Sequence, residues 1–400
     1  MNQDEVSLPK GWEIKKLREI LKIQNGYAFN SKLFSSERGT PLIRIRDIKQ
    51  GVGTETNFNG LYDKKYEVKA GDFLIGMDGE FGCYEWKGDI ALLNQRVCRL
   101  QEFNNRLYPR FLFYVINKYL KAIEDVTAFT TVKHISSKQI ENIEIPLPPI
   151  LEQQHIVAIL DKAFGAIAKA KVNTEQNLKN SKELFESYLE GIFADKQWER
   201  KTIGEVCEHV EYGTSTKSKK VGEIAVLRMG NIQNGRFTWD KLVYSSDADD
   251  NRQYLLKYND VLFNRTNSPE LVGKTAIYKG EMPAIFAGYL IRLHRKENLL
   301  DADFLNYYLN SKMAMEYGKT VVISSVNQAN INGTKLKGYP IPCPSLKAQQ
   351  TIVQKIDALS SETKKLEAVY QAKIINLEEL KKSILQKAFS GELTKAEVVA

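Results

Sequence analysis

The chain contains the same order of segments twice, and the second copy begins where the first one ends. Residues 8–13 (LPKGWE) open one half and residues 196–199 (KQWE) open the other, while residues 145–148 (IPLP) return as residues 341–344 (IPCP). This period is far longer than the repeat of roughly 20–50 residues that builds a solenoid. We therefore expect two units of domain size that share one fold.

The spacing of the two copies differs between their parts. Gln153 recurs as Gln349, an offset of 349 − 153 = 196, and the same offset separates Phe193 from its counterpart. Near the start of the copies, Trp12 recurs as Trp198, an offset of 198 − 12 = 186. The stretch after each globular half therefore carries no net insertion, whereas each globular half has its own loop lengths. A constant spacer with differing heads fits two related domains that recognise different targets.

Composition sets the outer limits of the prediction. With 400 residues, of which 43% are hydrophobic and 10% aromatic, the chain is long enough for two or more ordinary cores. Its net charge of +8 and its pI near 9.0 favour an anionic partner such as nucleic acid. The four cysteines have no CxxC spacing and the four histidines complete no zinc pattern, so we expect no metal and reduced cysteines.

The sequence carries no sign of export or of membrane insertion. Residues 1–5 (MNQDE) are polar and acidic, and no apolar run approaches the length that spans a bilayer. We therefore expect a cytoplasmic protein without a membrane partner.

Each globular half mixes short β-like runs with glycine-rich and asparagine-rich turns. In the first copy such runs are residues 41–45 and 72–75, followed by one helical stretch near 110–123. The second copy repeats this order with residues 223–228, 260–263 and a helix over 302–315. The predicted fold class is α+β, used twice.

A long helix follows each globular half. After each proline cluster the apolar residues recur with a period of about 3.6, and neither stretch contains a proline. About 45 residues extend roughly 65 Å, and an apolar stripe of that length needs a partner. We prefer an antiparallel coiled coil of the two helices, which places the domains at opposite ends with pseudo-twofold symmetry. A parallel pair, with the second domain as the return connection, stays open on the residues alone.

Two motifs carry a resemblance to a known family. Residues 145–154 (IPLPPILEQQ) recur at 341–350, and residues 71–74 (GDFL) recur as 259–262 (NDVL). With these motifs the chain resembles, from about Leu8 to Leu393, the specificity subunit of Type I restriction-modification enzymes. The second copy departs from the first at Asn259, which replaces Gly71, and at Ala348, which replaces Glu152.

The resemblance implies a non-catalytic, DNA-binding subunit. Its globular units would be target recognition domains, each reading one half of a bipartite asymmetric site in double-stranded DNA. Its helices would pair antiparallel, set the gap between the half-sites and dock two modification (methyltransferase) subunits. Cofactors would belong to the partners: S-adenosylmethionine to the modification subunits, and ATP with magnesium to translocating restriction subunits.

The expected boundaries follow from the repeat. Target recognition domain 1 covers residues 1–149 and the first spacer helix 150–196. Target recognition domain 2 covers residues 197–345, the second spacer helix 346–393, and a C-terminal tail 394–400.

The residues themselves also argue against catalysis. Adenine methylation needs an Asn-Pro-Pro-aromatic loop, but the one double proline, Pro148-Pro149, lies in a Leu-Pro-Pro-Ile sequence at a helix entrance, where proline is favoured structurally. Residues 268–275 (SPELVGKT) resemble a phosphate-binding loop but have serine where its first glycine belongs. We interpret this segment as a chance near-match and expect no enzyme activity.

DNA reading requires cations for phosphates and side chains with paired donors and acceptors for base edges. Loops in both copies supply such residues. The candidates in the first copy are Asn25, Tyr27, Lys32, Arg44, Arg46, Thr130, Thr131, Lys133 and His134. The candidates in the second copy are Thr214, Thr216, Lys217, Lys219, Lys220, Arg228, Asn231, Arg265, Thr266, Asn267 and Ser268.

The loop after the buried strand differs most between the copies. It carries Arg265, Thr266, Asn267 and Ser268 in the second copy, but Met77, Asp78, Glu80 and Phe81 in the first. Arginine or asparagine can bind guanine or adenine with two hydrogen bonds, and a carboxylate can accept from cytosine. This contrast predicts that the two domains read different bases. For any single residue, a solvated polar loop is the alternative.

A second function class also fits a long amphipathic helix pair. The chain could be a coiled-coil scaffold or adaptor whose two heads bind protein or carbohydrate. Basic loops at both heads and salt-sensitive binding would distinguish the DNA-binding class from it. On the DNA hypothesis the half-sites lie about one helical turn apart, roughly 34–36 Å.

Overall fold

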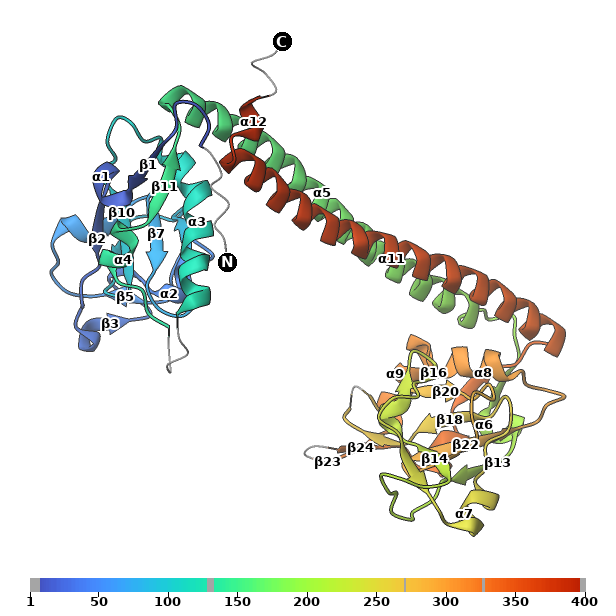
Figure 1. Cartoon of the computed structure of the whole chain (residues 1–400). Coiled ribbons are helices and arrows are strands. Elements are labelled where there is room, and N and C mark those ends of the chain that lie inside the picture. Colours follow the sequence, from blue (N-terminus) through green and yellow to red (C-terminus); the bar gives the residue numbers. More distant parts are fainter. Residues whose placement is uncertain (1–7, 128–132, 270, 326–327, 396–400) are drawn as a thin grey trace. The chain divides into compact units, whose positions relative to one another are not determined.

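The computed structural model describes residues 8–127, 133–269, 271–325 and 328–395. The chain forms two compact units, unit 1 (Met1–Asn173 with Ile374–Ala400) and unit 2 (Thr174–Lys373). Each unit consists of one globular domain and one segment from each of the two long helices, α5 (Ile150–Phe193) and α11 (Leu346–Phe389) (Figure 1). The stretches 150–196 and 346–393, expected to be spacer helices, contain α5 and α11, which end earlier, at Phe193 and Phe389.

Unit 1 is α+β, as its alternation of short apolar runs and turns predicts. Its elements besides the helix segments are β1 (Glu13–Lys16), α1 (Leu17–Ile20), β2 (Lys22–Asn25), η1 (Ser31–Leu33), β3 (Phe34–Ser35), β4 (Thr40–Ile43), α2 (Ile45–Ile48), β5 (Asn57–Phe58), η2 (Lys64–Tyr66), β6 (Glu67–Val68), β7 (Phe73–Gly76), β8 (Cys83–Glu85), β9 (Ala91–Leu93), β10 (Val97–Gln101), α3 (Pro109–Val126), α4 (Ser137–Glu141), β11 (Glu144–Leu147) and α12 (Glu392–Lys395).

Unit 2 repeats this order with different loop lengths. Its elements are β12 (Arg200–Thr202), α6 (Ile203–Val206), β13 (Cys207–Tyr212), β14 (Ile224–Leu227), η3 (Met229–Asn231), β15 (Ile232–Gln233), β16 (Arg236–Phe237), β17 (Val243–Ser245), α7 (Ala248–Gln253), β18 (Val261–Asn264), β19 (Thr266–Asn267), β20 (Thr275–Ile277), β21 (Ala284–Phe286), β22 (Leu290–Arg295), α8 (Ala302–Leu309), α9 (Lys312–Val321), β23 (Ile323–Ser325), β24 (Gln328–Asn330), α10 (Gly333–Lys337) and β25 (Pro340–Pro342).

The central sheet is the same in both units. Its strand order is β2-β10-β7-β8 in unit 1 and β13-β22-β18-β20 in unit 2, and all neighbours are antiparallel. The middle strands β7 and β18 are buried along their whole length, which is why their sequences, FLIG and VLFN, are almost continuously apolar. In each unit a second open sheet contains one parallel pair, β4 with β9 and β14 with β21. The fold class is α+β in both units, as predicted.

One helix covers the central sheet in unit 1, whereas in unit 2 the corresponding segment is divided into two helices. In unit 1 it is the single helix α3, whose buried Phe111, Val115 and Leu120 join the main core. In unit 2 the predicted single helix over 302–315 is wrong, because α8 ends at Leu309 and α9 starts at Lys312. Ser311 accounts for the break, since its hydroxyl caps α9 by accepting a hydrogen bond from the Ala314 amide.

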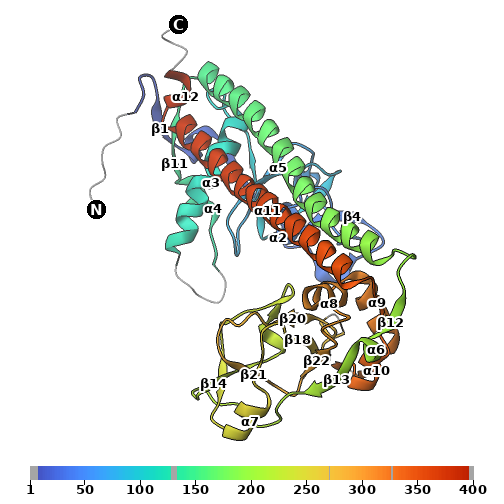
Figure 2. The same cartoon turned by 90° about the vertical axis from the view of Figure 1, so that its right-hand side faces the viewer.

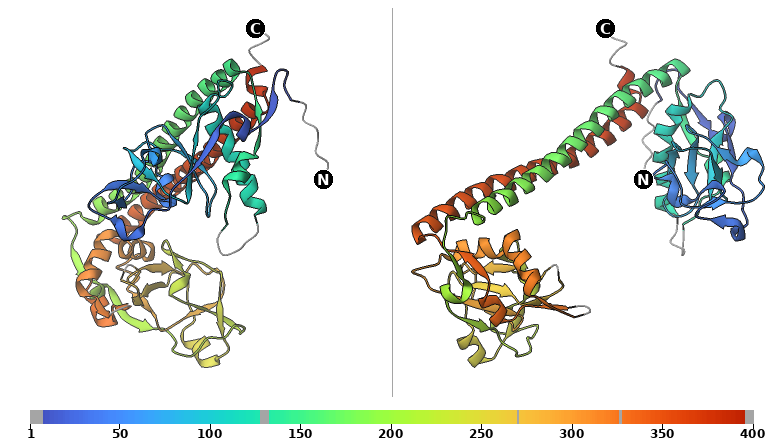
Figure 3. Two further views of the ribbon diagram at one scale, coloured as in Figure 1. Left: turned by 90° about the vertical axis from the view of Figure 1, so that its left-hand side faces the viewer. Right: turned by 180° about the vertical axis from the view of Figure 1, so that it is seen from behind.

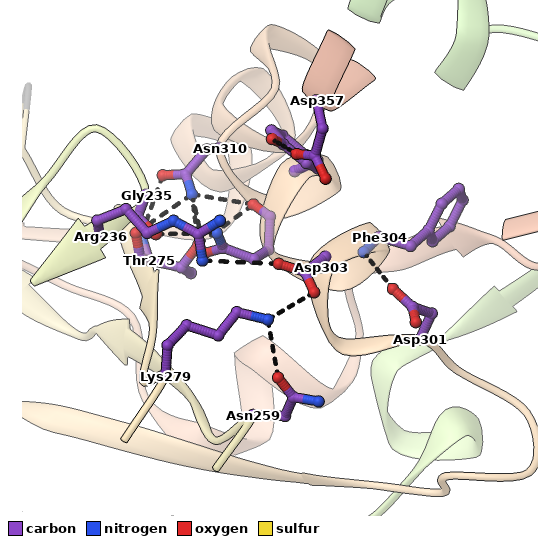
Figure 4. A network of polar contacts seen from close by, with 12 residues as sticks. Gly235, Arg236, Asn259, Thr275, Lys279, Asp301, Asp303, Phe304, Asn310 and Asp357 are labelled. Carbon is purple, nitrogen blue, oxygen red and sulfur yellow. Dashed lines mark hydrogen bonds and ion pairs between the residues drawn. The ribbon is translucent and has the colours of Figure 1, made fainter. Parts of the chain in front are cut away.

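An asparagine joins this helix to the sheet edge in both units. The Asn310 carboxamide accepts a bond from the Thr275 amide (3.1 Å) and donates one to the Thr275 carbonyl oxygen (3.2 Å) (Figure 4). In unit 1, Asn117 makes the same two bonds with Cys83, at 2.7 and 3.2 Å. Nearby ion pairs are reversed in sign: Asp303 on α8 pairs with Lys279 (2.7 Å), as Figure 4 shows, whereas α3 carries Arg110 and pairs with Glu85.

A buried glutamine fixes each globular domain to the helix that follows it. Gln153 and Gln349 are both 0% exposed. The Gln349 side chain accepts a bond from the Asp301 amide and donates to the carbonyl oxygens of Leu299 and Pro344, each at 2.8 Å. The Gln153 side chain makes the three equivalent bonds in unit 1, also at 2.8 Å. We call these two sets of contacts the glutamine clamps.

The two helix segments of each unit lie side by side (Figures 1 and 2). In unit 1 they run antiparallel, because early α5 meets late α11: Lys171 pairs with Glu378 (2.6 Å), and further toward the start of α5, Phe164 lies under the Lys381 ammonium. In unit 2, Tyr188 near the end of α5 and Ile352 near the start of α11 line one groove. The predicted antiparallel direction is confirmed within each unit.

Aromatic contacts seal each helix pair to its domain. In unit 1 the ring of Phe389 packs edge-on against Phe111 (5.9 Å between centroids), and in unit 2 Phe193 packs in the same way against Phe304 (5.5 Å). None of the helices in the described part of the chain is long and apolar enough to cross a membrane.

An arginine on the second strand of each central sheet bonds to acidic or polar side chains of neighbouring segments, and Arg292 is buried whereas Arg99 is partly exposed. Arg292 on β22 bonds to Asp260 (3.0 Å) and to Glu211 (2.5 Å), and Arg99 makes the equivalent 3.0 Å bond to Asp72 in unit 1. Where unit 2 has Glu211, unit 1 has the neutral Gln24. Burial alone raises the pKa of Glu211, but bonds from His294 and Arg292 outweigh it and hold this pKa below its ordinary value.

The glutamine clamp yields a first prediction. Replacing Gln349 with alanine leaves one amide and two carbonyl oxygens without their bonds, and we expect unit 2 to lose about 2–4 kcal/mol of unfolding free energy. Urea unfolding of the full chain measures this loss. Gln350→Ala, at the exposed neighbouring position, is the matched control and should change the urea midpoint very little.

Glu211 yields a prediction about pH. Because its folded-state pKa lies below the ordinary 4.5, the stability it contributes is present above that value and is lost as the pH falls through the folded-state pKa. We expect Glu211→Gln to flatten the fall in urea midpoint between neutral pH and pH values below about 4.5. An unchanged pH profile in the variant would show that Glu211 is not responsible.

Candidate nucleic-acid interface

Three backbone segments meet at the end of the central strand β7 in unit 1. The Met77 amide donates to the Arg96 carbonyl oxygen (3.0 Å), and the Ile135 amide donates to the Met77 carbonyl oxygen (2.9 Å). An isolated antiparallel bridge places Asp78 opposite His134. The loop that was predicted to follow the buried strand therefore lies beside the segment that carries the candidates Lys133 and His134.

These segments carry a row of polar side chains, His134, Asp78 and Arg96, which we call row 1. The Asp78 carboxylate binds the His134 ring through Oδ1 (Nδ1 to Oδ1, 2.6 Å) and the Arg96 guanidinium through Oδ2 (Nε to Oδ2, 3.3 Å). The Arg96 side chain is 59% exposed, whereas that of Asp78 is only 23% exposed. Row 1 is thus a solvent-facing arginine held by a half-buried carboxylate.

Unit 2 has the same backbone arrangement with other side chains. The Arg265 amide donates to the Tyr289 carbonyl oxygen (3.0 Å), the Ile331 amide donates to the Arg265 carbonyl oxygen (2.9 Å), and Thr266 pairs with Asn330. Asn330, Thr266 and Tyr289 form row 2. The Asn330 side-chain amide donates to the Thr266 hydroxyl (2.7 Å).

Asn330 lies on a hairpin that belongs to the body of unit 2. Strands β23 and β24 pair with each other, and β24 also pairs with β19 at the end of the central sheet. Figure 3 shows this hairpin projecting from the rest of the unit. It therefore places Asn330 opposite Thr266, the first residue of β19.

The other candidates of unit 1 fall into two groups. Asn25 and Tyr27 flank row 1, because Asn25 donates to the Ser137 hydroxyl (3.2 Å) and Tyr27 bridges to Asn94, two residues before Arg96. The remaining candidates lie in or beside short helical turns of the same domain: Lys32 in η1, and Arg44 and Arg46 at α2.

Arg44 and Arg46 differ in how firmly they are held. The Arg44 guanidinium lies over the Phe34 ring (5.8 Å to the centroid), and the exposed Arg46 lies 3.9 Å from Asp47. At the end of the same helical turn, Lys49 pairs with Glu80 (2.9 Å), and this partner raises the pKa of Lys49. Glu80 of the predicted reading loop is therefore engaged by a cation of its own domain.

In unit 2 most of the predicted cations face solvent. Thr216, Lys217, Lys219, Lys220 and Arg228 are exposed. The Lys219 backbone pairs with Tyr244, and Arg228 donates to the Lys241 carbonyl oxygen (3.0 Å). These residues remain candidates for phosphate contacts.

Three predicted readers turn out to hold the structure together. Asn231 is 4% exposed, and its side-chain amide bonds to the carbonyl oxygens of Thr238 and Asp240. Thr214 and Thr266 are each 5% exposed, with Thr214 donating to Asp250. We remove these three residues from the set of direct base contacts, because a buried, satisfied polar group cannot reach a groove edge without breaking its bonds.

Arg265 also has a structural position. Its guanidinium lies over the Tyr212 ring (4.9 Å) and donates to the Gly288 carbonyl oxygen (3.1 Å). Asn267 and Ser268 follow it, with the Asn267 side chain accepting a bond from the Ser268 amide (2.9 Å). In unit 1, Met77 and Phe81 are buried core residues and do not face solvent.

Three predicted residues of unit 1 remain to be placed. Thr130 and Thr131 lie outside the described residues. Lys133 donates to the Glu124 carbonyl oxygen (2.6 Å) next to row 1.

Sequence reasoning missed Arg96 and Tyr289. These two residues occupy equivalent turns, Arg96 just before β10 and Tyr289 just before β22. Aligning the two copies through these strands would have matched them. Within the described residues, no cluster of histidine, cysteine, aspartate or glutamate is placed to hold a metal ion.

Comparisons with known proteins show the family of the chain. A family model described as the Type I restriction modification DNA specificity domain matches residues 9–180 and again residues 195–376. The chain is 27% identical over 422 residues to the Type I restriction enzyme EcoBI specificity subunit of Escherichia coli, covering 97% of this chain and 88% of that protein. It is 24% identical over 409 residues to the MjaVIII specificity subunit of Methanocaldococcus jannaschii, covering 96% of this chain and 94% of that protein.

Solved structures share the fold. The HsdS subunit from Thermoanaerobacter tengcongensis matches with a TM-score of 0.59 and 20% identity, over 98% of this chain and all of that chain. A chain from a structure of a type I R-M system, described by its complex assembly, matches with a TM-score of 0.71 and 20% identity, over 96% of this chain and 98% of that chain. Because the family model covers both halves, the chain belongs to the Type I restriction-modification DNA specificity family, and its two globular domains are tandem target recognition domains.

Proposed function

We propose that this chain binds a bipartite, asymmetric site in double-stranded DNA, with each globular domain reading one half. The observation that carries the proposal is the pair of rows: one backbone frame occurs twice, with His134, Asp78 and Arg96 in one copy and Asn330, Thr266 and Tyr289 in the other. Equal frames with unequal polar side chains suit two domains that contact DNA in the same way but read different bases.

The exposed cations supply the sequence-independent part of this binding. We assign phosphate contacts to Lys217, Lys219, Lys220 and Arg228 of unit 2 and to Lys32 and Arg46 of unit 1, and their exposure supports this assignment. The net charge of +8 agrees with an anionic partner. Binding should therefore weaken steeply with added salt, as counterion release requires.

The long helices set the distance between the half-sites in this proposal. Each of them is a single helix of 44 residues, and both copies have the same length. Such paired helices form a spacer of fixed length. The half-sites would lie about one helical turn apart, roughly 34–36 Å, with a non-specific gap between them.

The chemistry belongs to the partners in this proposal. The relatives are named as subunits of restriction enzymes, which supports assembly of this chain with other subunits. We propose two modification subunits that bind S-adenosylmethionine and flip the target adenine, and restriction subunits that use ATP and magnesium. This chain would supply sequence recognition and no catalytic residue.

Long-read methylome sequencing tests the proposed function. A methylation-free host expresses the cognate modification subunit with or without this chain. A new bipartite motif that depends on the chain is the expected result. A well-expressed complex that methylates no such motif would contradict the proposal and favour a scaffold that binds protein or carbohydrate.

An insertion tests the spacer. Four residues, about one helical turn, are inserted after Asn173, and a matched variant carries four residues after Lys373 as well, so that both helices lengthen. We expect an altered gap and unchanged half-sites in the methylome. A changed half-site with an unchanged gap would refute the spacer role of the helices.

A further inference from the structure

We propose that the two rows determine which base each domain reads. Arg96, positioned by Asp78, reads a guanine in the half-site of the first domain, and Asn330, positioned by Thr266, reads an adenine in the half-site of the second. This inference rests on the proposed function, and it assigns the specificity to named side chains.

The backbone frame gives both rows the same position in their domains. In each unit the first residue after the central strand, Met77 or Arg265, makes two backbone bonds. Its amide donates to the turn before the neighbouring strand of the sheet, β10 or β22 (3.0 Å), and its carbonyl oxygen accepts from the amide of Ile135 or Ile331 (2.9 Å). The next residue, Asp78 or Thr266, then faces His134 or Asn330. A shared backbone frame with different side chains is expected of two related domains that recognise different base sequences.

Row 1 has the chemistry of a guanine reader. Asp78 binds the Nε atom of Arg96, so the two terminal nitrogens remain as a planar pair of donors on a side chain that is 59% exposed. Two parallel donors match the O6 and N7 acceptors of guanine in the major groove. His134 holds the other oxygen of Asp78 (2.6 Å), which fixes the carboxylate that orients the arginine.

Asp78 is therefore a positioning residue. It is less exposed than Arg96, and both of its oxygens already have partners in its own domain. The prediction that a carboxylate in this loop accepts from cytosine gives way to this arrangement. An arginine ordered before binding loses less side-chain entropy when it meets the base.

Row 2 has the chemistry of an adenine reader. The Thr266 hydroxyl accepts one N–H of the Asn330 carboxamide (2.7 Å) and so fixes the orientation of the amide. The second N–H and the carbonyl oxygen of an asparagine match the N7 acceptor and the N6 donor of adenine. Thr266 is buried and acts only by positioning Asn330.

The neighbouring polar side chains fit base reading less well. Arg265 lies against Tyr212 and donates to the Gly288 carbonyl oxygen, and Glu80 is paired with Lys49. These contacts hold Arg265 and Glu80 without presenting a pair of hydrogen-bonding groups to a base edge. Arg96 and Asn330 combine a fixed orientation with a recognised base-edge pattern.

The experiment uses the full chain with its cognate modification subunit and reads specificity by methylome sequencing. Arg96→Ala should relax one guanine position in one half-site by about 5- to 150-fold and leave the other half-site and the gap unchanged. Asn330→Ala should relax one adenine position in the opposite half-site. Gln95→Ala and Gln233→Ala, at exposed glutamines in the same domains, are the matched controls.

The opposite outcomes overturn the inference. If the wild-type motif forms but Arg96→Ala relaxes no guanine, or both variants act on the same half-site, the assignment fails while the proposed function stands. If the wild-type chain directs no motif, the proposed function fails first. Where a variant abolishes methylation, the purified complex is titrated with duplexes that differ at the base pair in question, and equal weakening for all four base pairs contradicts a reading role.

The positioning role of Asp78 has its own readout. Asp78→Asn should relax the same guanine position as Arg96→Ala, and the double variant should be no worse than Arg96→Ala alone, because both changes remove one interaction. A merely structural role would lower methylation at every position together, and additive losses would contradict the positioning role.

Discussion

The structure depends on the burial of one glutamine in each unit. Gln153 and Gln349 sit at the first turn of a long helix and bond to three backbone groups of the preceding domain. A rotation of the domain about the helix would break these bonds, and each lost bond would leave a buried polar group unsatisfied. Rigid attachment of this kind is a prerequisite for a protein that presents a reading surface at a set place. The same glutamine clamp occurs in both units, so the two domains are attached to their helices in the same way.

Apart from the glutamine clamps, the two units share some contacts and differ in others. Three kinds of contact recur at matching positions of the two units. They are the Arg99–Asp72 and Arg292–Asp260 ion pairs, the asparagine links from Asn117 and Asn310, and the helix-to-domain bonds between Tyr114 and Asp161 and between Tyr307 and Asp357. These contacts lie in the interior or at the helix, where a change costs stability. Within the rows, Arg96 and Tyr289 are exposed to solvent, and side chains at such positions can differ at little cost. Specificity can therefore vary while the fold stays the same.

Much of the fold follows from the sequence, because its repeat and its apolar periods are long-range signals. The order of elements, the long helices and their antiparallel direction within each unit were predicted, and the Gln-Gln motif was identified although its clamp was not. The break between α8 and α9 was missed, because it depends on the capping of one residue, Ser311. The candidate site was harder to predict. Polar residues in turns serve the turn as readily as a ligand, which is why Asn231, Thr214 and Thr266 proved buried. Arg96 was missed because nothing in its local sequence marks it, and only the pairing of β7 with β10 brings it to Asp78.

The central claim is that a common backbone frame carries interchangeable reading rows. Its most direct test is to transplant row 2 into the first domain by combining Asp78→Thr, Arg96→Tyr and His134→Asn, and then to sequence the methylome directed by the complex. The account predicts that one guanine of the first half-site is replaced by an adenine, while the second half-site and the gap stay as they were. A first half-site that keeps its guanine, or a change that appears in the second half-site, would contradict it.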